Sequence, residues 1–371
     1  MPAPIHPDAG STGDQRAAAP ATTRLAVSIT SNTLCFGGAE RQRVVLANGL
    51  LRRGYDVRMV LIQDDGPLLG QLDPQVRVVR PRRFFNHTVS PHDGGVMVTG
   101  TTNTECSHAC LWRYAAPRSR RWIVASHTPG TFLERTYEPI LHHLIVRSDG
   151  LIALSERHAE ALRAHEGFRL PTAIIPNGTD LAPAPRARSL PPGGLRFGVV
   201  GRLVPQKGID LLLAALAGLP SDLPPWEVVV AGWGDELDGD RAEAVRLGLG
   251  GRVRWLGPVD FPQAIDAFDV LVLPSRSEAL PMVLIEAMMS GVPVMASAVG
   301  SVPELLGHGR HGTLVEPTAD AWRDALVRAL GRELPLEQAA DAALAHARVE
   351  LTADAMVDRY ARVIDDVAVT R

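Results

Sequence analysis

Short apolar runs alternate with amphipathic stretches along most of the chain, and this alternation predicts a parallel α/β fold. Residues 24–30 form an apolar run, residues 39–53 place apolar side chains on one helical face, and residues 55–62 form the next apolar run. The loop between the first two contains Gly37 and Gly38, which would let backbone N–H groups approach a ligand at the helix N-terminus. The alternative is that these two glycines serve only a tight turn between the strand and the helix. A strand, a glycine loop, a helix and a second strand are the start of a parallel sheet.

Further apolar runs predict the remaining strands, at residues 76–79, 96–99, 122–126, 150–154, 172–175, 195–200, 226–231, 252–256, 269–273, 292–295 and 313–315. Residues 181–194, LAPAPRARSLPPGG, have no periodicity and are typical of a linker between domains. The predicted domain limits are a disordered leader at 1–23, a first Rossmann-like domain at 24–182, a linker at 183–194, a second domain at 195–350 and a C-terminal helix at 351–371.

The unit that carries most chemistry spans residues 271–294, LVLPSRSEALPMVLIEAMMSGVPV. After a buried strand and a polar turn, residues 282–290 form a predicted helix with Pro281 in its first turn. Glu278 lies before this helix and Glu286 lies inside it. A helix N-terminus attracts anions and carboxylates accept hydrogen bonds from hydroxyls, so the unit predicts a site for a polar ligand.

Two further residues stand out by type and position. Lys207, in the loop at residues 201–208, is the only lysine among 38 basic residues. Because the chain otherwise uses arginine, a lysine here suggests that a compact ammonium is needed, as at a phosphate. His127 directly follows the apolar run 122–126, and the carboxyl end of a strand is where α/β sheets place ligands. A structural loop histidine is the alternative for His127.

Charge is unevenly distributed along the chain. The net charge of −3 argues against a nucleic-acid partner, yet residues 1–185 carry 20 basic and 16 acidic side chains, whereas residues 186–371 carry 18 and 25. The basic half contains two arginine clusters, one followed by a pair of phenylalanines: Arg80, Arg82, Arg83, Phe84 and Phe85, then Arg118, Arg120 and Arg121. These clusters have two interpretations: they contact an anionic membrane surface, or they lie in ordinary solvated loops.

Neither a disulfide framework nor a metal site is expected. Three cysteines are an odd number, which fits a reducing compartment. The spacing of Cys106, His108 and Cys110 does not match zinc ligands. Asp238 and Asp240 resemble an acid pair that holds a metal in some sugar transferases, but we interpret them as a solvated first helical turn. No apolar run is long enough to span a membrane, and we expect a cytoplasmic protein.

Taken in order, the motifs resemble those of retaining glycosyltransferases of family 4, the group 1 enzymes with the GT-B fold. The resemblance extends from about Leu25 to the C-terminal helix. The residues that carry it are Gly37-Gly38-Ala39-Glu40-Arg41, Ser126-His127, Pro176-Asn177-Gly178, Gly201-Arg202, Lys207-Gly208, and Pro274-Ser275 with Glu278 and Glu286. One departure is Ala279, at a position where the family commonly has glycine.

The resemblance implies two facing Rossmann-like domains with the active site in a cleft between them and a C-terminal helix that crosses back to the first domain. By similarity, Arg202 and Lys207 hold the donor diphosphate, Glu286 binds the ribose and Glu278 binds the transferred sugar. Donor contacts would also come from Gly37 and Gly38 in the first domain and from the backbone of the second, around Leu280, Pro281, Met282 and Val283. His127 would lie beside the reacting centre.

The implied activity is transfer of a sugar, with retention of configuration, from a UDP- or GDP-sugar to a glycan or lipid-linked acceptor. Bacterial cell-surface polysaccharide or lipopolysaccharide assembly at the inner face of the cytoplasmic membrane would be its setting, without metal or other cofactor. Two alternatives stay open. A sugar-nucleotide epimerase or another GT-B enzyme would share the fold, and a non-catalytic binder would retain the nucleotide without releasing it from a donor.

Overall fold

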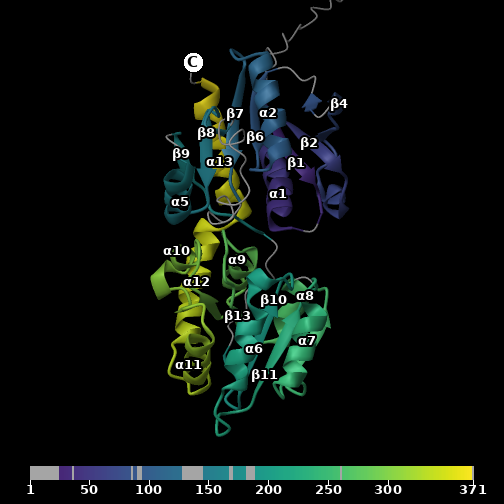
Figure 1. Ribbon diagram of the computed structural model, residues 1–371. Helices are drawn as coiled ribbons and strands as arrows, with labels where there is room; N and C mark the ends of the chain where they lie inside the picture. Colours follow the sequence, from purple (N-terminus) through teal and green to yellow (C-terminus); the bar gives the residue numbers. More distant parts are fainter. Residues whose placement is uncertain are drawn as a thin grey trace, which may run out of the picture.

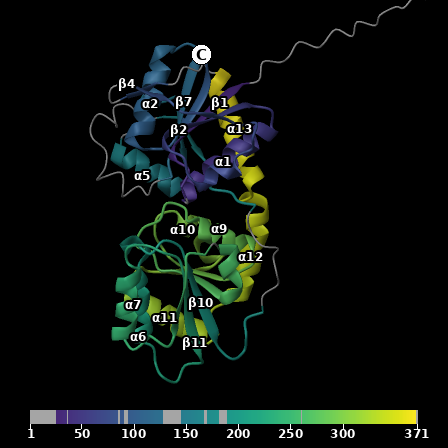
Figure 2. The same ribbon diagram turned by 90° about the vertical axis from the view of Figure 1, so that its right-hand side faces the viewer.

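The computed structural model describes residues 25–35, 37–84, 87–89, 94–127, 145–166, 170–180, 189–259 and 261–369. Two parallel sheets, each flanked by helices, lie one above the other and are joined by the last two helices of the chain (Figures 1 and 2). The predicted α/β class with two Rossmann-like domains is therefore confirmed. The predicted leader at residues 1–23 lies outside the described residues.

The first sheet has seven strands in the order β3-β2-β1-β6-β7-β8-β9, and every neighbouring pair is parallel. Its strands are β1 (Ala26–Thr33), β2 (Asp56–Asp64), β3 (Arg77–Val79), β6 (Gly95–Thr99), β7 (Arg120–Ala125), β8 (Gly150–Ala153) and β9 (Thr172–Ile174). Its helices are α1 (Gly38–Arg52), the 3₁₀ helix η1 (Pro67–Gln71), α2 (Asn103–Ala115) and α5 (Glu156–Glu166). A separate antiparallel pair is formed by β4 (Arg82–Phe84) and β5 (His87–Val89).

The second sheet has six parallel strands in the order β12-β11-β10-β13-β14-β15. The strands are β10 (Leu195–Val200), β11 (Trp226–Ala231), β12 (Val253–Gly257), β13 (Val270–Leu273), β14 (Val294–Ser297) and β15 (Thr313–Val315). The helices of this domain are η2 (Pro205–Lys207), α6 (Ile209–Ala217), α7 (Leu237–Arg246), α8 (Phe261–Ala264), η3 (Ile265–Ala267), α9 (Met282–Met289), α10 (Val302–Leu305), η4 (Gly307–Gly309), α11 (Ala319–Leu330) and α12 (Leu336–Glu350). The last helix of the chain is α13 (Ala353–Val369).

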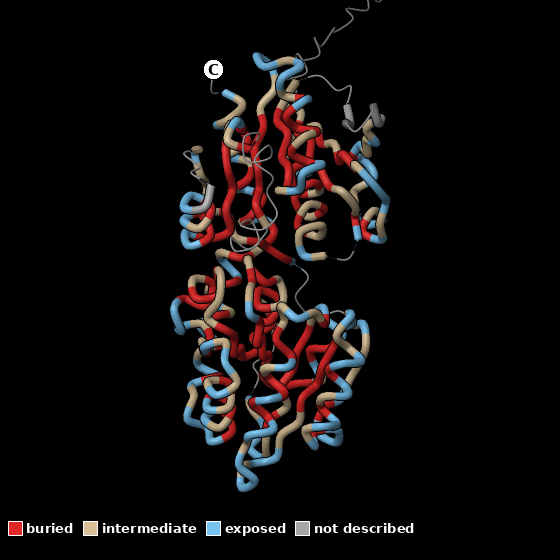
Figure 3. Tube along the Cα trace, in the orientation of Figure 1, coloured by how far each residue is buried: buried red, intermediate tan, exposed pale blue. Residues whose placement is uncertain are grey.

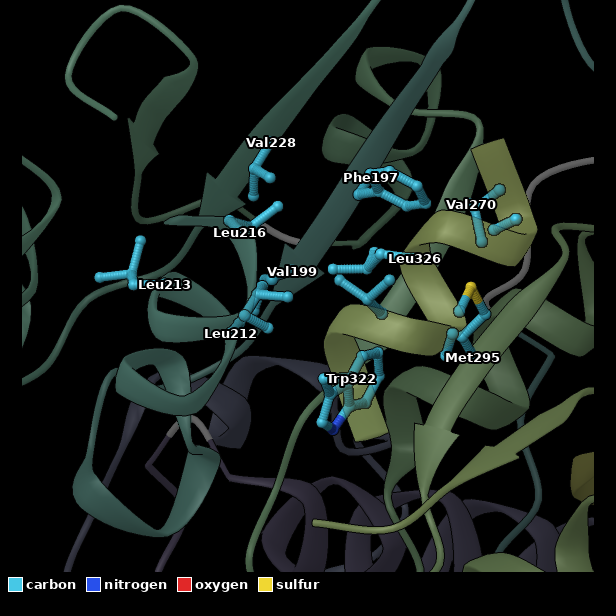
Figure 4. Close-up of a cluster of buried hydrophobic side chains, with 14 of the residues drawn as sticks. Phe197, Val199, Leu212, Leu213, Leu216, Val228, Val270, Met295, Trp322 and Leu326 are labelled. Carbon is cyan, nitrogen blue, oxygen red and sulfur yellow. The ribbon is translucent and has the colours of Figure 1, made fainter. Parts of the chain in front are cut away.

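The strands are apolar along their length, so both faces of each sheet must be covered by helices to keep these side chains from water. Strand β13, with the sequence VLVL, is buried at every position, as expected for a central parallel strand. On one face of the second sheet, Phe197 and Val199 of β10 pack with Leu212 of α6 and Trp322 of α11 (Figure 4). The burial pattern shows the same arrangement for both domains, with buried strands inside and exposed residues on the outer helices (Figure 3).

Helix α13 returns the chain to the first domain, as the resemblance implied. In both views it leaves the second domain beside α12 and lies along the first sheet (Figures 1 and 2). It packs against α1, where a β-carbon placed on Gly49 would lie 2.5 Å from Cγ2 of Val357. Glycine at this position allows the two helices to approach closely.

The carboxyl ends of the two sheets face each other. Asn177, which follows β9, donates a hydrogen bond from Nδ2 to the carbonyl oxygen of Leu280 at 3.2 Å. Ser155, which follows β8, donates from Oγ to Oγ of Ser301 at 2.8 Å, and both serines are buried. Residues that follow the strands of one domain therefore meet residues that follow the strands of the other.

Candidate functional site

Glu278 and Lys207 form the centre of the candidate site. Glu278 follows β13 and is buried, and its Oε1 accepts hydrogen bonds from Nζ of Lys207 and from Oγ of Ser275, each at 2.6 Å. The Lys207 side chain keeps 21% of its surface exposed. A buried carboxylate is thus held by one ammonium and one hydroxyl, and the lysine side chain still reaches solvent.

The loop after β10 brings Lys207 to this position. Gly208 has a φ of +67°, and a β-carbon there would lie 2.2 Å from the carbonyl oxygen of Pro274. Glycine is required for so close an approach between the loop and the end of β13. Gln206 strengthens the contact by donating from Nε2 to the carbonyl oxygen of Ser277 at 2.6 Å. Arg202 lies in the same loop and is exposed, and among the described residues it has no hydrogen-bond or ion-pair partner.

Glu286 lies in α9 and meets the first domain. Nη1 of Arg41, in α1, lies 3.3 Å from Oε1 of Glu286, and the side chain of Glu286 is 7% exposed. Gly38 faces the start of α9, because a β-carbon on it would lie 3.3 Å from Cγ of Met282. Gln42 donates from Nε2 to Sδ of Met282 at 3.2 Å. The amino-terminal turns of α1 and α9 therefore contact each other across the two domains.

His127 follows β7 and lines a small cavity of about 10 Å³, large enough for about one water molecule. The other lining residues come from β1, α1, β6, β7 and α13: Ile29, Gln42, Arg43, Leu46, Val98, Thr99, Ala125, Met356 and Tyr360. Burial, followed by the positive charge of Arg43, lowers the pKa of His127 to about 3. The imidazole is therefore neutral at physiological pH.

A second histidine fixes the segment that precedes His127. Nδ1 of the buried His158 accepts a hydrogen bond from the backbone N–H of Leu154 at 3.2 Å. Its proton therefore lies on Nε2, which is 3.5 Å from Oγ of Ser126. This contact ties α5 to the residue beside His127.

The predicted residues thus fall into two groups. One group lies where the domains meet or beside that contact: Gly38, Lys207, Glu278, Leu280, Met282 and Glu286. In the other group, Gly37 precedes α1, Pro281 is the residue before α9, and Val283 is in its first turn. Arg202 is exposed, and His127 is at the carboxyl end of the first sheet.

Arg41 is the residue that the site assignment from sequence missed. It belongs to the motif that carries the resemblance, which assigns no role to it. One signal was available, because Arg41 lies three residues after Gly38 in a helix and therefore on the same face as the glycine predicted to contact the donor. Gln42 is a second residue that the sequence did not indicate. Its Oε1 accepts a hydrogen bond from the backbone N–H of Gly178 at 3.1 Å, and its Nε2 donates to the carbonyl oxygen of Gly178 at 3.0 Å.

One expectation about Asp238 and Asp240 was wrong. Asp238 is exposed, but Asp240 is buried, and burial raises the pKa of its carboxyl to about 6. Two residues apart on a helix, the side chains point to different sides, so the pair is not one solvated turn. Among the described residues, no group of three or more His, Cys, Asp and Glu side chains is arranged to hold a metal ion. Cys106, His108 and Cys110 are buried in α2.

The second arginine cluster lies at the amino end of β7 in the first sheet. Arg120 begins β7, whereas His127 follows its end, so the cluster and the candidate site are separated by the length of the strand. The Arg120 guanidinium covers the Trp112 ring at 5.1 Å. In the first cluster, Arg80 is paired with Asp65, and the side chains of residues 82–85 lie outside the described ones. No helix in the described ranges is long and apolar enough to cross a membrane.

Comparison with known proteins agrees with this arrangement. Residues 185–344 match the family described as Glycosyl transferases group 1. The chain is 32% identical over 223 residues to the exopolysaccharide phosphotransferase SCO2592 of Streptomyces coelicolor, covering 59% of this chain and 23% of that protein. It is 32% identical over 246 residues to the D-inositol 3-phosphate glycosyltransferase of Mycobacterium marinum, covering 60% of this chain and 52% of that protein. The chain thus spans about half the length, or less, of these curated relatives.

The solved structure of Anabaena Alr3699/HepE in complex with UDP-glucose has the same fold over nearly the whole chain. The TM-score is 0.76 at 20% sequence identity, covering 92% of this chain and all of that one. At this identity the likeness concerns the fold alone, and that fold is the predicted one. Residues 185–344 therefore match the group 1 glycosyltransferases, within a chain that has the GT-B fold.

Proposed function

We propose that this protein is a retaining glycosyltransferase of family 4 that transfers a sugar from a UDP- or GDP-sugar to a glycan or lipid-linked acceptor. The observation that carries the proposal is the contact between Lys207 and Glu278, 2.6 Å long, at the carboxyl end of the second sheet. An ammonium and a carboxylate side by side are the two groups needed where a phosphate and a sugar hydroxyl of one ligand are bound together. The relatives named as glycosyltransferases and the neighbour bound to UDP-glucose support the same reaction class.

The donor diphosphate would be held by Lys207 and by the exposed Arg202. Both cations belong to the loop after β10. Negative charge develops on the diphosphate as the glycosidic bond breaks, and two cations placed beside it stabilise that charge in the transition state. The same role is often taken by a divalent metal, so two protein cations support a reaction without metal, as expected from the sequence.

The two carboxylates would hold hydroxyl groups. Glu278 would bind the transferred sugar and Glu286 the ribose. Both are now paired with cations, Glu278 with Lys207 and Glu286 with Arg41. Donor binding would therefore exchange partners, because the diphosphate offers Lys207 a stronger counter-charge and leaves Glu278 an acceptor for hydroxyls. Backbone groups of Leu280, Pro281, Met282 and Val283, with Gly37 and Gly38 from the first domain, would complete the donor contacts.

His127 would lie beside the reacting centre as a neutral group. With a pKa near 3 in the ligand-free chain, its imidazole is a weak base and suits hydrogen bonding to a hydroxyl better than proton abstraction. This supports a front-face substitution, in which the departing phosphate oxygen accepts the proton of the acceptor hydroxyl. Retention of configuration follows from attack on the face that the phosphate leaves.

The acceptor would be a growing cell-surface polysaccharide or lipopolysaccharide, met at the inner face of the cytoplasmic membrane. Peripheral contact with anionic lipid would use the arginine clusters of the first domain. Binding to vesicles of 30% anionic lipid that is lost at 0.5 M salt supports this setting. Complete recovery in the supernatant with such vesicles at low salt would refute it.

A donor screen tests the activity. The full chain is incubated with a panel of UDP- and GDP-sugars and with oligosaccharide or lipid-linked acceptors, and released nucleoside diphosphate and product mass are measured. We expect acceptor-dependent release of UDP or GDP and a product whose anomeric configuration, read by NMR, matches the donor. A changed donor without acceptor would indicate an epimerase. Tight nucleotide binding without release from any donor would indicate a non-catalytic binder.

A further inference from the structure

Trp233 differs from the other tryptophans of the chain because its side chain is open to solvent, with an exposed fraction of 56%. The other five are buried or half-buried: Trp112, Trp122, Trp226, Trp255 and Trp322. The two half-buried rings are covered by arginines. Arg252 lies 4.5 Å from the centre of the Trp226 ring. Arg241 lies 5.8 Å from that of Trp255. The fold thus shields its tryptophans from water but leaves Trp233 accessible.

The position of Trp233 is fixed by the loop that carries Arg202 and Lys207. The carbonyl oxygen of Trp233 accepts a hydrogen bond from the backbone N–H of Leu203 at 2.8 Å. On either side of it, Gly232 and Gly234 lie directly against the same loop, because β-carbons there would be 1.8 and 2.1 Å from carbonyl oxygens of that loop. Any larger residue at either glycine would separate the two loops. The backbone of Trp233 is therefore held against the loop that carries the proposed phosphate-binding residues.

The order of the strands arranges these residues in a line. Glu278 follows β13, Lys207 lies in the loop after the adjacent β10, and Trp233 follows β11, the next strand. Neighbouring strands are about 4.8 Å apart, so each loop lies one short step beyond the last along the carboxyl edge of the sheet. If Glu278 binds the sugar and Lys207 the diphosphate, the remaining part of the donor beyond the diphosphate is the nucleoside. An aromatic ring at that place has the chemistry to stack on a nucleobase.

We propose that Trp233 stacks on the base of the nucleotide-sugar donor and so contributes to affinity for the nucleotide. This inference rests on the proposed function, since it takes Lys207 as the phosphate-binding residue. Stacking uses the faces of both rings and is tolerant of base identity. Trp233 would therefore strengthen binding of both UDP and GDP, and would contribute nothing to a ligand that has phosphates but no base.

Calorimetric titration of the full chain with UDP, GDP and inorganic pyrophosphate tests this assignment. For Trp233→Ala we expect the Kd of UDP and GDP to rise by about 5- to 100-fold, the usual range for losing one base–aromatic stack. The Kd of pyrophosphate should stay unchanged. Trp233→Phe should keep most of the nucleotide affinity, because it retains a ring. Tyr114→Ala, which removes an exposed aromatic ring from α2 in the first domain, is the matched control and should bind as the wild type does.

The outcomes separate the inference from the proposed function. If Trp233→Ala binds UDP and GDP like the wild type while Lys207→Ala loses affinity, then Trp233 does not stack on the base. The assignment of Lys207 to the donor site would be unaffected. Equal loss of pyrophosphate and nucleotide affinity in Trp233→Ala would also overturn the inference, because the ring would then act through the phosphate loop. If the wild-type chain binds neither nucleotide, the donor site itself is refuted. Thermal unfolding of each variant verifies that it is folded.

Discussion

At the scale of single residues, the ligand-free chain keeps its two site carboxylates neutralised. Lys207 pairs with Glu278 within the second domain, and Arg41 pairs with Glu286 between the domains. A buried carboxylate without a partner would cost several kcal/mol, so these cations stabilise the empty site as well as preparing it for an anionic ligand. In the proposed reaction these residues are already in place before the donor binds, and they exchange partners when it does.

His127 makes a prediction about stability and pH. Its pKa is about 3 in the folded chain and about 6.5 when unfolded, so below pH 6.5 only the unfolded chain takes up this proton. Stability should therefore fall as the pH falls. Between pH 7 and pH 5 the wild type should lose about 1 to 2 kcal/mol more unfolding free energy than His127→Gln does. Urea unfolding at several pH values measures the difference.

The exposed His308 supplies the control for this experiment. His308→Asn should follow the wild-type pH dependence, because this side chain is in contact with water in the folded chain as well as in the unfolded one. Parallel pH profiles for the wild type and His127→Gln would contradict the neutral state assigned to His127.

At the scale of secondary-structure elements, helix α5 is capped by the other domain. Oε2 and Oε1 of Glu304, in α10, accept hydrogen bonds from the backbone N–H groups of Glu156 and Arg157 at 2.9 and 2.7 Å. A carboxylate at this end of a helix satisfies otherwise unpaired donors and interacts favourably with the helix dipole. Because α5 also carries His158, which contacts Ser126, this cap connects α10 of the second domain to the segment that holds His127.

Removing the Glu304 carboxylate should loosen this end of α5. We expect Glu304→Ala to reduce the unfolding free energy by about 1 kcal/mol and to speed hydrogen exchange at the amides of Glu156 and Arg157. Glu337→Ala is the matched control, because Glu337 accepts one backbone hydrogen bond, from Leu190, without reaching the first domain. Unchanged exchange at both amides in Glu304→Ala would refute the cap.

The contact between α1 and α13 makes a further prediction. In Gly49→Ala the new methyl group would meet Val357, and overpacking should outweigh the gain in helix propensity, for a net loss of about 1 kcal/mol. In a Val357→Ala background the methyl group has room, so the same substitution should be neutral or stabilising. Chemical denaturation of the four proteins in a double-mutant cycle measures the coupling. Additive effects would show that Gly49 and Val357 do not constrain the helix pair.

Local patterns made most elements predictable from sequence. The strand and helix of the unit containing Glu278 and Glu286 lie within a few residues of their predicted limits, because apolar runs, Pro281 and Gly291 are local signals. Contacts between distant segments were not predictable in this way. Arg41 and Glu286 are 245 positions apart, and nothing in either local sequence specifies that they meet. In α13, Val357 and Tyr360 are buried because the helix crosses back onto the first domain, and the local sequence does not specify that crossing.

At the scale of the whole molecule, the two sheets present their carboxyl ends to each other, and the proposed function depends on that arrangement. The second domain provides Lys207, Glu278 and Glu286, and the first provides Gly38, Arg41 and His127. Contacts between the domains come from the loops after β8 and β9 and from the first turns of α1 and α9. A donor bound at this place would touch both domains, so its binding would be sensitive to their relative position.

The most direct test of the central claim is sugar transfer by Lys207→Ala. With the donor and acceptor found in the screen, we expect kcat/KM to fall by about 100-fold or more, since a cation at the developing phosphate charge is lost. Thermal unfolding should show that the variant is still folded. Arg254→Ala, which removes an exposed cation from β12 of the same domain, should transfer sugar like the wild type. Near-normal transfer by folded Lys207→Ala would contradict the assignment of the donor site.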